Sequence, residues 1–190
     1  MAVWNDNMIL YHGSYCAVRE PDLHKCSPYK DFGRGFYLTT SKQQAKSFVA
    51  SSIKKALQLG AISENPGFGY VSSYQFRLFP ECRVLEYEDA DVAWLHCIAA
   101  HRKYEMFPDI RKALENYDII AGKIANDRTN ATLTAYLSGL YGDVGLVDAA
   151  EDCIRRLLPE RLENQICLRS PRALEALVYA GEEKVWLNKL

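Results

Sequence analysis

The sequence predicts an α+β fold in which β-strands near both ends of the chain enclose a run of helices. Short apolar runs typical of strands occur at residues 8–12 and again at 163–169. Segments with helical periodicity fill most of the interval 91–157. No alternation of strand and helix indicates a parallel βαβ sheet, and no linker divides the chain, so we expect one domain over residues 1–190.

The strands are predicted from short apolar or alternating segments. The first, at residues 8–12, ends at Gly13, and the glycines and prolines that follow predict a long surface loop up to Gly35. Residues 70–79 alternate between apolar and polar side chains, the period-2 signature of a strand with one buried face. The other strands are expected at residues 36–39, 83–87, 118–121, 163–169 and 184–187.

The helix that follows the second strand has the clearest signals. Ser41 with Gln44 three residues later matches a capping box, and apolar residues recur at helical spacing after it. Gly60 is a suitable stop for this helix, and Pro108 suits the first turn of another. The other helices are expected at residues 91–103, 108–115, 129–140, 146–157 and 171–177.

The composition is that of an ordinary globular protein, with 48% apolar and 25% charged residues. A formal net charge of −1 provides no general positive field, so nucleic acid is not expected as a partner. No signal peptide and no run of about 18 apolar residues is found, so we expect a cytoplasmic protein without a membrane partner. The six cysteines are scattered without a CxxC pair, which favours reduced thiols and predicts no metal site.

Two segments near the N-terminus carry residues suited to one ligand site. His12 stands at the end of an apolar strand, and Gly13 beside it lets a ligand amide approach the backbone closely. In residues 33–40 (GRGFYLTT) two glycines bracket Arg34, and Tyr37 follows with a ring on which a flat ligand can stack.

Two later segments add charged and amide groups. The sequence ENQ at residues 163–165 begins a late strand and places Glu163 and Gln165 on one face of it. Asp127 and Arg128 stand immediately before an expected helix, where they either cap that helix or contribute to the site.

These segments resemble the ADP-ribosyltransferase superfamily, in particular its histidine–tyrosine–glutamate branch, which includes the poly(ADP-ribose) polymerases and diphtheria toxin. LYHGS (10–14) resembles the first motif of that branch, GRGFYLTTSKQQAKSF (33–48) its second and ENQICL (163–168) its third, in the same order. The chain is most similar to a little-characterised bacterial family with a DFG-x-GFY segment and a later A-[DN]-D-R segment. The resemblance implies a core of split mixed and antiparallel β-sheets with flanking helices.

Residue by residue, the resemblance implies how NAD is held. His12 hydrogen-bonds the ribose on the adenine side, while the Gly13 backbone and Ser14 hold the carboxamide of nicotinamide. Tyr37 stacks on the nicotinamide ring, and Phe48, eleven residues later, closes its other side. The expected NAD-binding residues are completed by Arg34, Gly35, Asp127 and Arg128.

The third motif departs from the family pattern, because Gln165 stands at the position of the catalytic glutamate. A glutamine accepts a hydrogen bond but carries no charge, and losing one aimed electrostatic group costs roughly 10²–10³ in rate. Glu163 and Asp127 are alternative sources of that charge. The expected catalytic residues are therefore Gln165, Tyr37, His12 and Glu163.

The leading hypothesis is an enzyme that uses NAD as substrate, transfers ADP-ribose to an unidentified macromolecular acceptor and releases nicotinamide. In one form of this hypothesis the protein is a bacterial toxin or effector, with a cognate antitoxin as a candidate partner. The neutral Gln165 leaves two alternatives open. One is a non-catalytic module that binds NAD or ADP-ribose, and the other is an NAD glycohydrolase with water as the acceptor.

Overall fold

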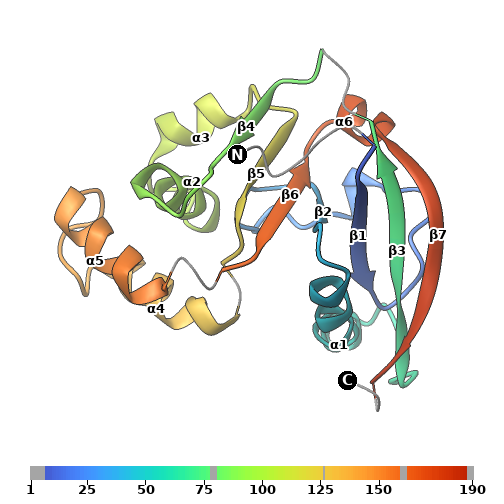
Figure 1. Ribbon diagram of the computed structural model, residues 1–190. Coiled ribbons are helices and arrows are strands. Elements are labelled where there is room, and N and C mark those ends of the chain that lie inside the picture. The colour runs from blue at the N-terminus through green and yellow to red at the C-terminus, as the bar shows by residue number, and fades with distance from the viewer. Residues whose placement is uncertain (1–6, 78–80, 126, 159–161, 188–190) are drawn as a thin grey trace.

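The chain forms two β-sheets with helices packed on them, and the computed structural model describes residues 7–77, 81–125, 127–158 and 162–187 (Figure 1). The predicted α+β class, with one antiparallel and one mixed sheet, is confirmed. The strands are β1 (Ile9–Ser14), β2 (Phe36–Leu38), β3 (Phe68–Phe76), β4 (Val84–Glu86), β5 (Ile119–Lys123), β6 (Asn164–Leu168) and β7 (Leu177–Trp186). The helices are the 3₁₀ turn η1 (Leu23–Lys25) and α1 (Lys42–Gln58), α2 (Val92–Arg102), α3 (Pro108–Leu114), α4 (Asp127–Leu137), α5 (Val147–Leu157) and α6 (Pro171–Glu175).

The antiparallel sheet has the strand order β1-β3-β7, and the mixed sheet has the order β2-β6-β5-β4. In the mixed sheet, β2 and β5 both run antiparallel to β6, whereas β4 and β5 are parallel. The helices α2 and α3 connect this parallel pair, so the expectation of no βαβ alternation was wrong for one unit. Parallel neighbours need such a crossover because a short hairpin turn cannot join them.

The two sheets meet at one point of backbone pairing. The Tyr11 amide donates to the Thr39 carbonyl at 2.8 Å, and the Thr39 amide donates to the Tyr11 carbonyl at 3.0 Å. This bridge is isolated, so over the described residues β1 and β2 form no ladder beyond it. The result is a split between the sheets, bordered by β1 on one side and β2 on the other (Figure 1).

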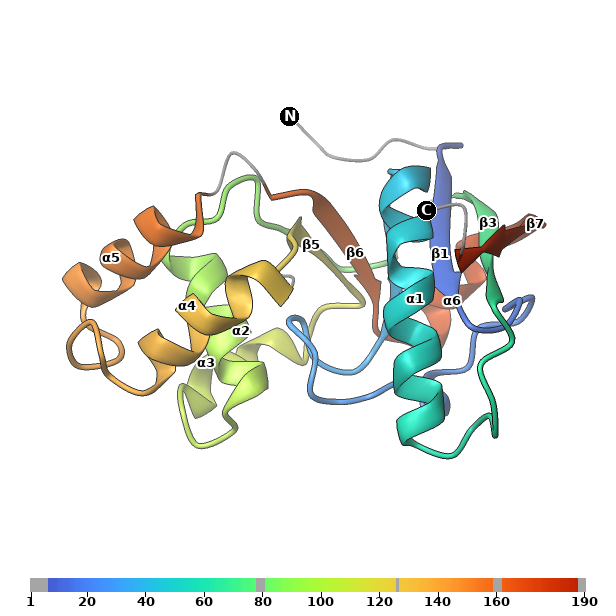
Figure 2. The ribbon, with the colours of Figure 1, turned by 90° about the horizontal axis from the view of Figure 1, so that it is seen from below.

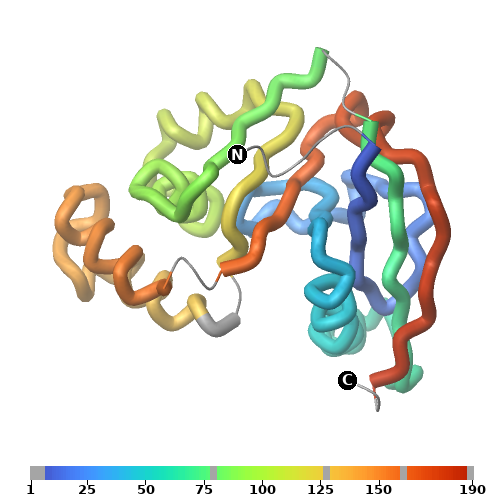
Figure 3. Tube along the Cα trace, in the orientation of Figure 1, coloured from blue at the N-terminus to red at the C-terminus, as the bar shows by residue number. Residues whose placement is uncertain are grey.

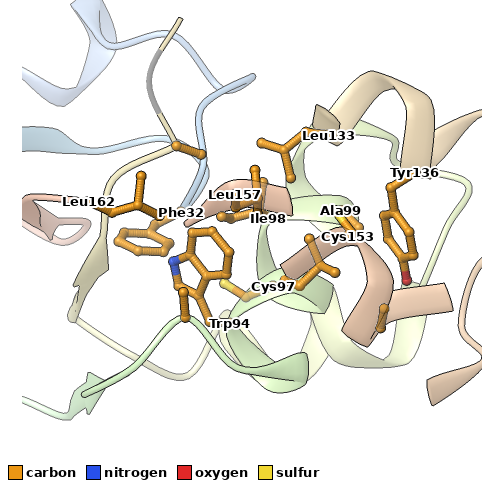
Figure 4. Close-up of a cluster of buried hydrophobic side chains, with 14 of the residues drawn as sticks. Phe32, Trp94, Cys97, Ile98, Ala99, Leu133, Tyr136, Cys153, Leu157 and Leu162 are labelled. Atoms are coloured by element: carbon orange, nitrogen blue, oxygen red, sulfur yellow. The ribbon is translucent and has the colours of Figure 1, made fainter. Parts of the chain in front are cut away.

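Three apolar clusters hold the layers together. One lies between the sheets, where Leu10, Phe36, Tyr74 and Ile166 are buried. A second packs α2, α4 and α5 on the mixed sheet around Trp94, and Figure 4 shows its side chains converging from helices and loop. The third packs α1 on the antiparallel sheet; Figure 2 shows that helix lying alongside β1.

Helix α1 begins and ends as its sequence predicts. The amide of Gln44 donates to the Ser41 side chain at 3.1 Å, which caps the helix N-terminus. The side chain of Gln44 does not complete the capping box, because it accepts from the Thr39 hydroxyl instead. At the other end Gly60 adopts a positive φ of 69°, as expected of a helix stop.

The structure differs from the sequence prediction in two further places. The last strand, expected only at residues 184–187, begins at Leu177, because β7 pairs with β3 along its whole length. The expected surface loop 13–35 is partly an interior element, since Asp31, Phe32 and Gly35 are buried. Figure 3 shows this loop, in light blue, passing beside β6. Residues 78 and 79 of the expected third strand lie outside the described ranges.

All six cysteines are free. Among the helices of the described ranges, none combines the length and the apolar character needed to cross a membrane.

Candidate functional site

His12 lies on β1 at the split between the sheets and reaches the strand opposite. Its Nδ1 atom donates to the carbonyl oxygen of Tyr37 at 2.8 Å, and its ring lies 4.5 Å from the ring of Phe36. Burial lowers the pKa of His12, and the Tyr37 carbonyl only partly opposes this effect. The ring is therefore neutral near pH 7, with its proton on Nδ1 and a lone pair on Nε2 that makes no hydrogen bond to a described residue.

Gly13 is tightly packed where a side chain would stand, whereas its peptide N–H and C=O point away from β3. A Cβ atom at this position would lie 1.8 Å from the carbonyl oxygen of Ala45, so the glycine is required by the close approach of α1 rather than by a ligand. All residues of β1 lie opposite residues of β3, but in an antiparallel ladder only alternate ones form hydrogen bonds to the partner strand, and Tyr11 turns its peptide groups toward Thr39 instead. The N–H and C=O of Gly13 point the same way as those of Tyr11, into the split.

Helix α1 forms one wall of this split. The Ser52 hydroxyl lies 3.4 Å from the Ser14 hydroxyl and accepts from the Tyr15 amide at 3.1 Å, so Ser14 is anchored to the helix. Phe48 stands one turn before Ser52 and one turn after Gln44, whose side chain binds at the bridge between the sheets. Side chains spaced in this way share a helix face, so Phe48 projects toward the split and remains partly exposed there.

The side chain of Tyr37 secures the loop that precedes β2. Its hydroxyl donates to the carbonyl of Gly33 at 2.9 Å and accepts from the amide of Phe32 at 2.9 Å. Burial raises the pKa of Tyr37 well above its ordinary value, with smaller contributions from Cys167 and Asp31. Tyr37 is thus neutral, and its ring is held in place because its hydroxyl both donates and accepts a hydrogen bond within the protein.

Gln165 is the second residue of β6 and lies on the same face of the mixed sheet as Tyr37. Its Nε2 atom donates to Oδ2 of Asp31 at 2.9 Å, and both residues are buried. Asp31 also accepts from the Ala125 amide at 3.1 Å and forms an ion pair with Arg102 at 2.7 Å. Because the amide nitrogen of Gln165 is held by a carboxylate, its Oε1 atom is turned away and is left to accept another hydrogen bond.

Asp31 and Arg102 are the residues that the sequence prediction missed. Asp31 stands in the DFG segment that carried the family resemblance, but no role was expected for it. The available signal was a carboxylate directly before the apolar Phe32 in a glycine-containing loop. Nothing in the sequence pairs it with Arg102, which is 71 residues away.

The remaining predicted residues are not brought together with His12, Tyr37 and Gln165 in one group. Gly35 packs on β6, where a Cβ would lie 2.3 Å from Sγ of Cys167. Arg34 is exposed at a different pocket, beyond the end of β6. Glu163 is exposed just before β6, and only its carbonyl is engaged, by the Ile124 amide at 2.8 Å.

Asp127 and Arg128 form the first residues of α4. Their side chains lie outside the described part of the structure, as does Asn126. In the described part, no group of three or more histidine, cysteine, aspartate or glutamate side chains has the arrangement of a metal site.

Comparison with known proteins identifies a family for this chain. No curated protein matches it. A family model described as "Protein of unknown function (DUF3990)" matches residues 8–179, which is most of the 190 residues and includes both sheets except the end of β7. The chain therefore belongs to the DUF3990 family.

Proposed function

We propose that this protein binds NAD in the split between the sheets and transfers ADP-ribose from it to a macromolecular acceptor. One observation carries the proposal: the open peptide edge of Gly13 and the unengaged Nε2 of His12 lie together beside β2. A peptide N–H and C=O side by side are the complement of a primary carboxamide, which offers one acceptor and two donors. Nicotinamide carries such a group.

The residues around that edge fit the rest of the nicotinamide riboside. The lone pair of His12 Nε2 suits a ribose hydroxyl, which donates to it. Phe48 offers an apolar ring at the split, and Tyr37 offers a second ring held fixed by its hydroxyl. The fixed Tyr37 ring, the Phe48 ring and the peptide edge of Gly13 would together orient the nicotinamide by the faces of its ring and by its carboxamide.

Gln165 and Asp31 supply the chemistry of the proposed reaction as a pair. The bond between C1′ of the ribose and the nicotinamide nitrogen breaks, its electrons leave with neutral nicotinamide, and positive charge develops on the ribose. Oε1 of Gln165 accepts from the ribose 2′-hydroxyl, and the Asp31 carboxylate behind it contributes negative charge. An acceptor nucleophile then forms the new bond to C1′ and loses its proton to solvent.

The ion pair with Arg102 favours a second candidate function. Because this guanidinium lies 2.7 Å from Asp31, it offsets part of the charge available to a ribose cation. A module that binds NAD or ADP-ribose without turnover needs the binding groups of the split and no such charge. Hydrolysis of NAD differs from transfer only in the acceptor, which is then water.

The proposal is tested by incubating the purified protein with NAD labelled in its adenylate, alone and with cell lysate. We expect NAD to raise the thermal midpoint, nicotinamide to be released, and label to appear on a macromolecule. His12→Ala should weaken NAD binding about tenfold, because a buried hydrogen bond is lost. His24→Ala, at an exposed histidine of η1, is the matched control. Absence of NAD stabilisation in the unmodified protein would refute the proposal.

Asp31→Asn separates the two candidate functions. It keeps the shape and one acceptor for Gln165 but removes the carboxylate charge. For a transferase we expect nicotinamide release to fall roughly 10²-fold while NAD affinity changes little. If NAD binds and no nicotinamide is released by the unmodified protein or by Gln165→Glu, the binding module is the correct function. Free labelled ADP-ribose without labelled macromolecule would instead indicate hydrolysis.

A further inference from the structure

A pocket lies beyond the C-terminal end of β6, away from Gly13 and His12. It has a volume of about 450 Å³ and is formed by the loop before β2, the last turn of α2, α3 and the residue that follows β6. Arg169 at this pocket is four positions from Gln165 along an extended chain, a separation of about 13 Å. The pocket is lined by Pro28, Gly33, Arg34, His101, Tyr104, Arg111, Glu115 and Arg169.

Three guanidinium groups gather at this pocket around a single carboxylate. Arg34, Arg111 and Arg169 line it together with Glu115, and no ion pair joins any of these four side chains to another described residue. By contrast, Arg102 is paired with Asp31 nearby. The pocket therefore carries a net charge of about +2 that the protein itself does not balance, which favours binding of an anion.

Two of the arginines are held in place by backbone groups. Arg111 donates to the Tyr104 carbonyl at 3.0 Å, and its guanidinium lies 4.7 Å from the centre of the Tyr104 ring. Arg169 donates through Nη1 to the carbonyls of Leu114 and Tyr117. Each guanidinium keeps further N–H groups for a ligand, and little ordering of these side chains remains to oppose binding.

The pocket wall also contains two buried nitrogen atoms without a hydrogen-bond partner in the described structure. They are Nε2 of His101, a residue only 3% exposed, and Nε of Arg169. The His101 ring is fixed by its Nδ1 atom, which donates to the Cys97 carbonyl at 2.9 Å, and it lies directly against Gly33. Buried polar atoms of this kind usually meet water or a ligand, so they point to an occupant of this pocket. Nε of Arg169 donates, which suits a phosphate oxygen, whereas Nε2 of the Nδ1-protonated His101 ring accepts and is suited to a bound water or to the hydroxyl of a monoprotonated phosphate.

From this arrangement we propose that the pocket is a phosphate-binding site, separate from the NAD site. The planar guanidinium fork matches phosphate oxygens in pairs, and three such forks exceed what the two oxygens of a carboxylate can engage. A phosphate or phosphomonoester dianion also balances the net charge of the pocket. The volume leaves room for a small organic group, so free phosphate and a phosphorylated small molecule share this chemistry.

Binding of inorganic phosphate and of AMP to the full chain, measured by isothermal titration calorimetry in chloride buffer, tests the proposal. We expect one saturable site and about tenfold weaker binding in Arg34→Gln, since a charge-assisted hydrogen bond is removed. Arg34 is exposed and makes no hydrogen bond to a described residue, so we expect this change to leave the fold intact. Lys112→Gln removes the same charge from an exposed position of α3 and should bind like the unmodified protein.

The two ligands distinguish the source of the phosphate. Tighter binding of AMP than of inorganic phosphate identifies a phosphorylated small molecule, and equal binding identifies the phosphate group alone; both support the site. No saturation below about 10 mM of either ligand, or equal weakening in Arg34→Gln and Lys112→Gln, would overturn it. Displacement of phosphate by NAD would assign the pocket to the NAD site and overturn its independence. None of these outcomes depends on nicotinamide release.

Discussion

Gly13 combines a packing role and a proposed binding role in one residue. Its face is in contact with the Ala45 carbonyl of α1, and its edge presents N–H and C=O groups to the split. The sequence prediction was that a ligand amide approaches the backbone closely at this glycine. The structure shows that the approaching group is a helix backbone, so loss of function in a Gly13 variant would by itself say nothing about ligand contact.

We expect Gly13→Ala to destabilise the protein by about 3 kcal/mol or more, because the new methyl group would overlap the Ala45 carbonyl and push α1 from β1. Chemical denaturation measures this change. Gly122→Ala is the control: it also lies within a strand, but its nearest neighbour would be the Cβ of Tyr87 at 3.1 Å. If Gly13→Ala lowers the free energy of unfolding no more than Gly122→Ala does, the close packing of α1 on Gly13 is contradicted.

Part of the candidate site could be predicted residue by residue, and part could not. His12 and Tyr37 stand in short segments whose local pattern is visible, and they do meet across the split. Asp31 joins Gln165 over a separation of 134 residues, and that contact depends on how the loop folds back over the mixed sheet. Periodicity and spacing describe neighbours along the chain, so they contain no information on such a pair.

At the scale of elements, the helix ends show which local signals are reliable. Helix α1 ends with Gly60 in the left-handed region, and the Ala61 amide donates to the Ala56 carbonyl at 2.8 Å. This is a Schellman arrangement, and it places the helix stop at the glycine that the sequence predicts. Helix α5 ends differently, at Leu158, which adopts a positive φ of 51° although it is not a glycine.

Leu158→Gly should therefore stabilise the protein by about 0.5 kcal/mol. The left-handed conformation costs a leucine roughly 1–2 kcal/mol, and this relief exceeds the added entropy of the unfolded chain. The side chain is 43% exposed, so little burial is lost. The free energy of unfolding, measured in urea, gives the sign directly.

Leu140→Gly is the matched control for that change. Leu140 is also an exposed leucine just beyond a helix, but it is not among the described residues with positive φ. For Leu140→Gly we expect the free energy of unfolding to fall by about 0.5–1 kcal/mol, because glycine only adds entropy to the unfolded chain. If both substitutions destabilise equally, backbone strain at Leu158 is not the cause.

The strands were less predictable than the helices. A helix is formed by neighbours along the chain, whereas β7 exists because β3 lies beside it from Leu177 to Trp186. The strand contains Glu182 and Glu183, so its sequence lacks the apolar alternation that predicts a strand. Glu182 makes an ion pair with Arg19, and Glu183 makes ion pairs with Lys42 and Lys46. The parallel pairing of β4 with β5 is likewise a long-range property that no local signal specifies.

At the scale of the whole molecule, the two sheets and the helical layer are joined through few buried polar groups. The loop before β2 connects them: Asp31 binds β6 through Gln165 and α2 through Arg102. His101, on the last turn of α2, packs against Gly33 of the same loop. The charge state of His101 should therefore affect the stability of the entire fold rather than one element.

Burial lowers the pKa of His101 to about 4, with Arg169 and Arg111 adding to the effect and the Cys97 carbonyl opposing it. The unfolded chain has the ordinary histidine pKa near 6.5, so between pH 6.5 and 4 the unfolded state binds more protons. The contribution of neutral His101 is thus complete above about pH 6.5 and is lost as the pH falls to about 4. The difference amounts to about 3 kcal/mol over this window.

We expect His101→Asn to flatten the acid limb of the stability profile, because its amide can still donate to the Cys97 carbonyl but cannot be protonated. Urea denaturation between pH 4 and 7 measures the slope, in phosphate-free buffers so that the proposed anion site stays out of the comparison. Burial also lowers the pKa of His12 and His96, so a residual slope of the same sign remains. An unchanged slope in His101→Asn would show that protonation of this ring does not lower the free energy of unfolding. The contact between α2 and the loop before β2 would then not depend on the charge of His101.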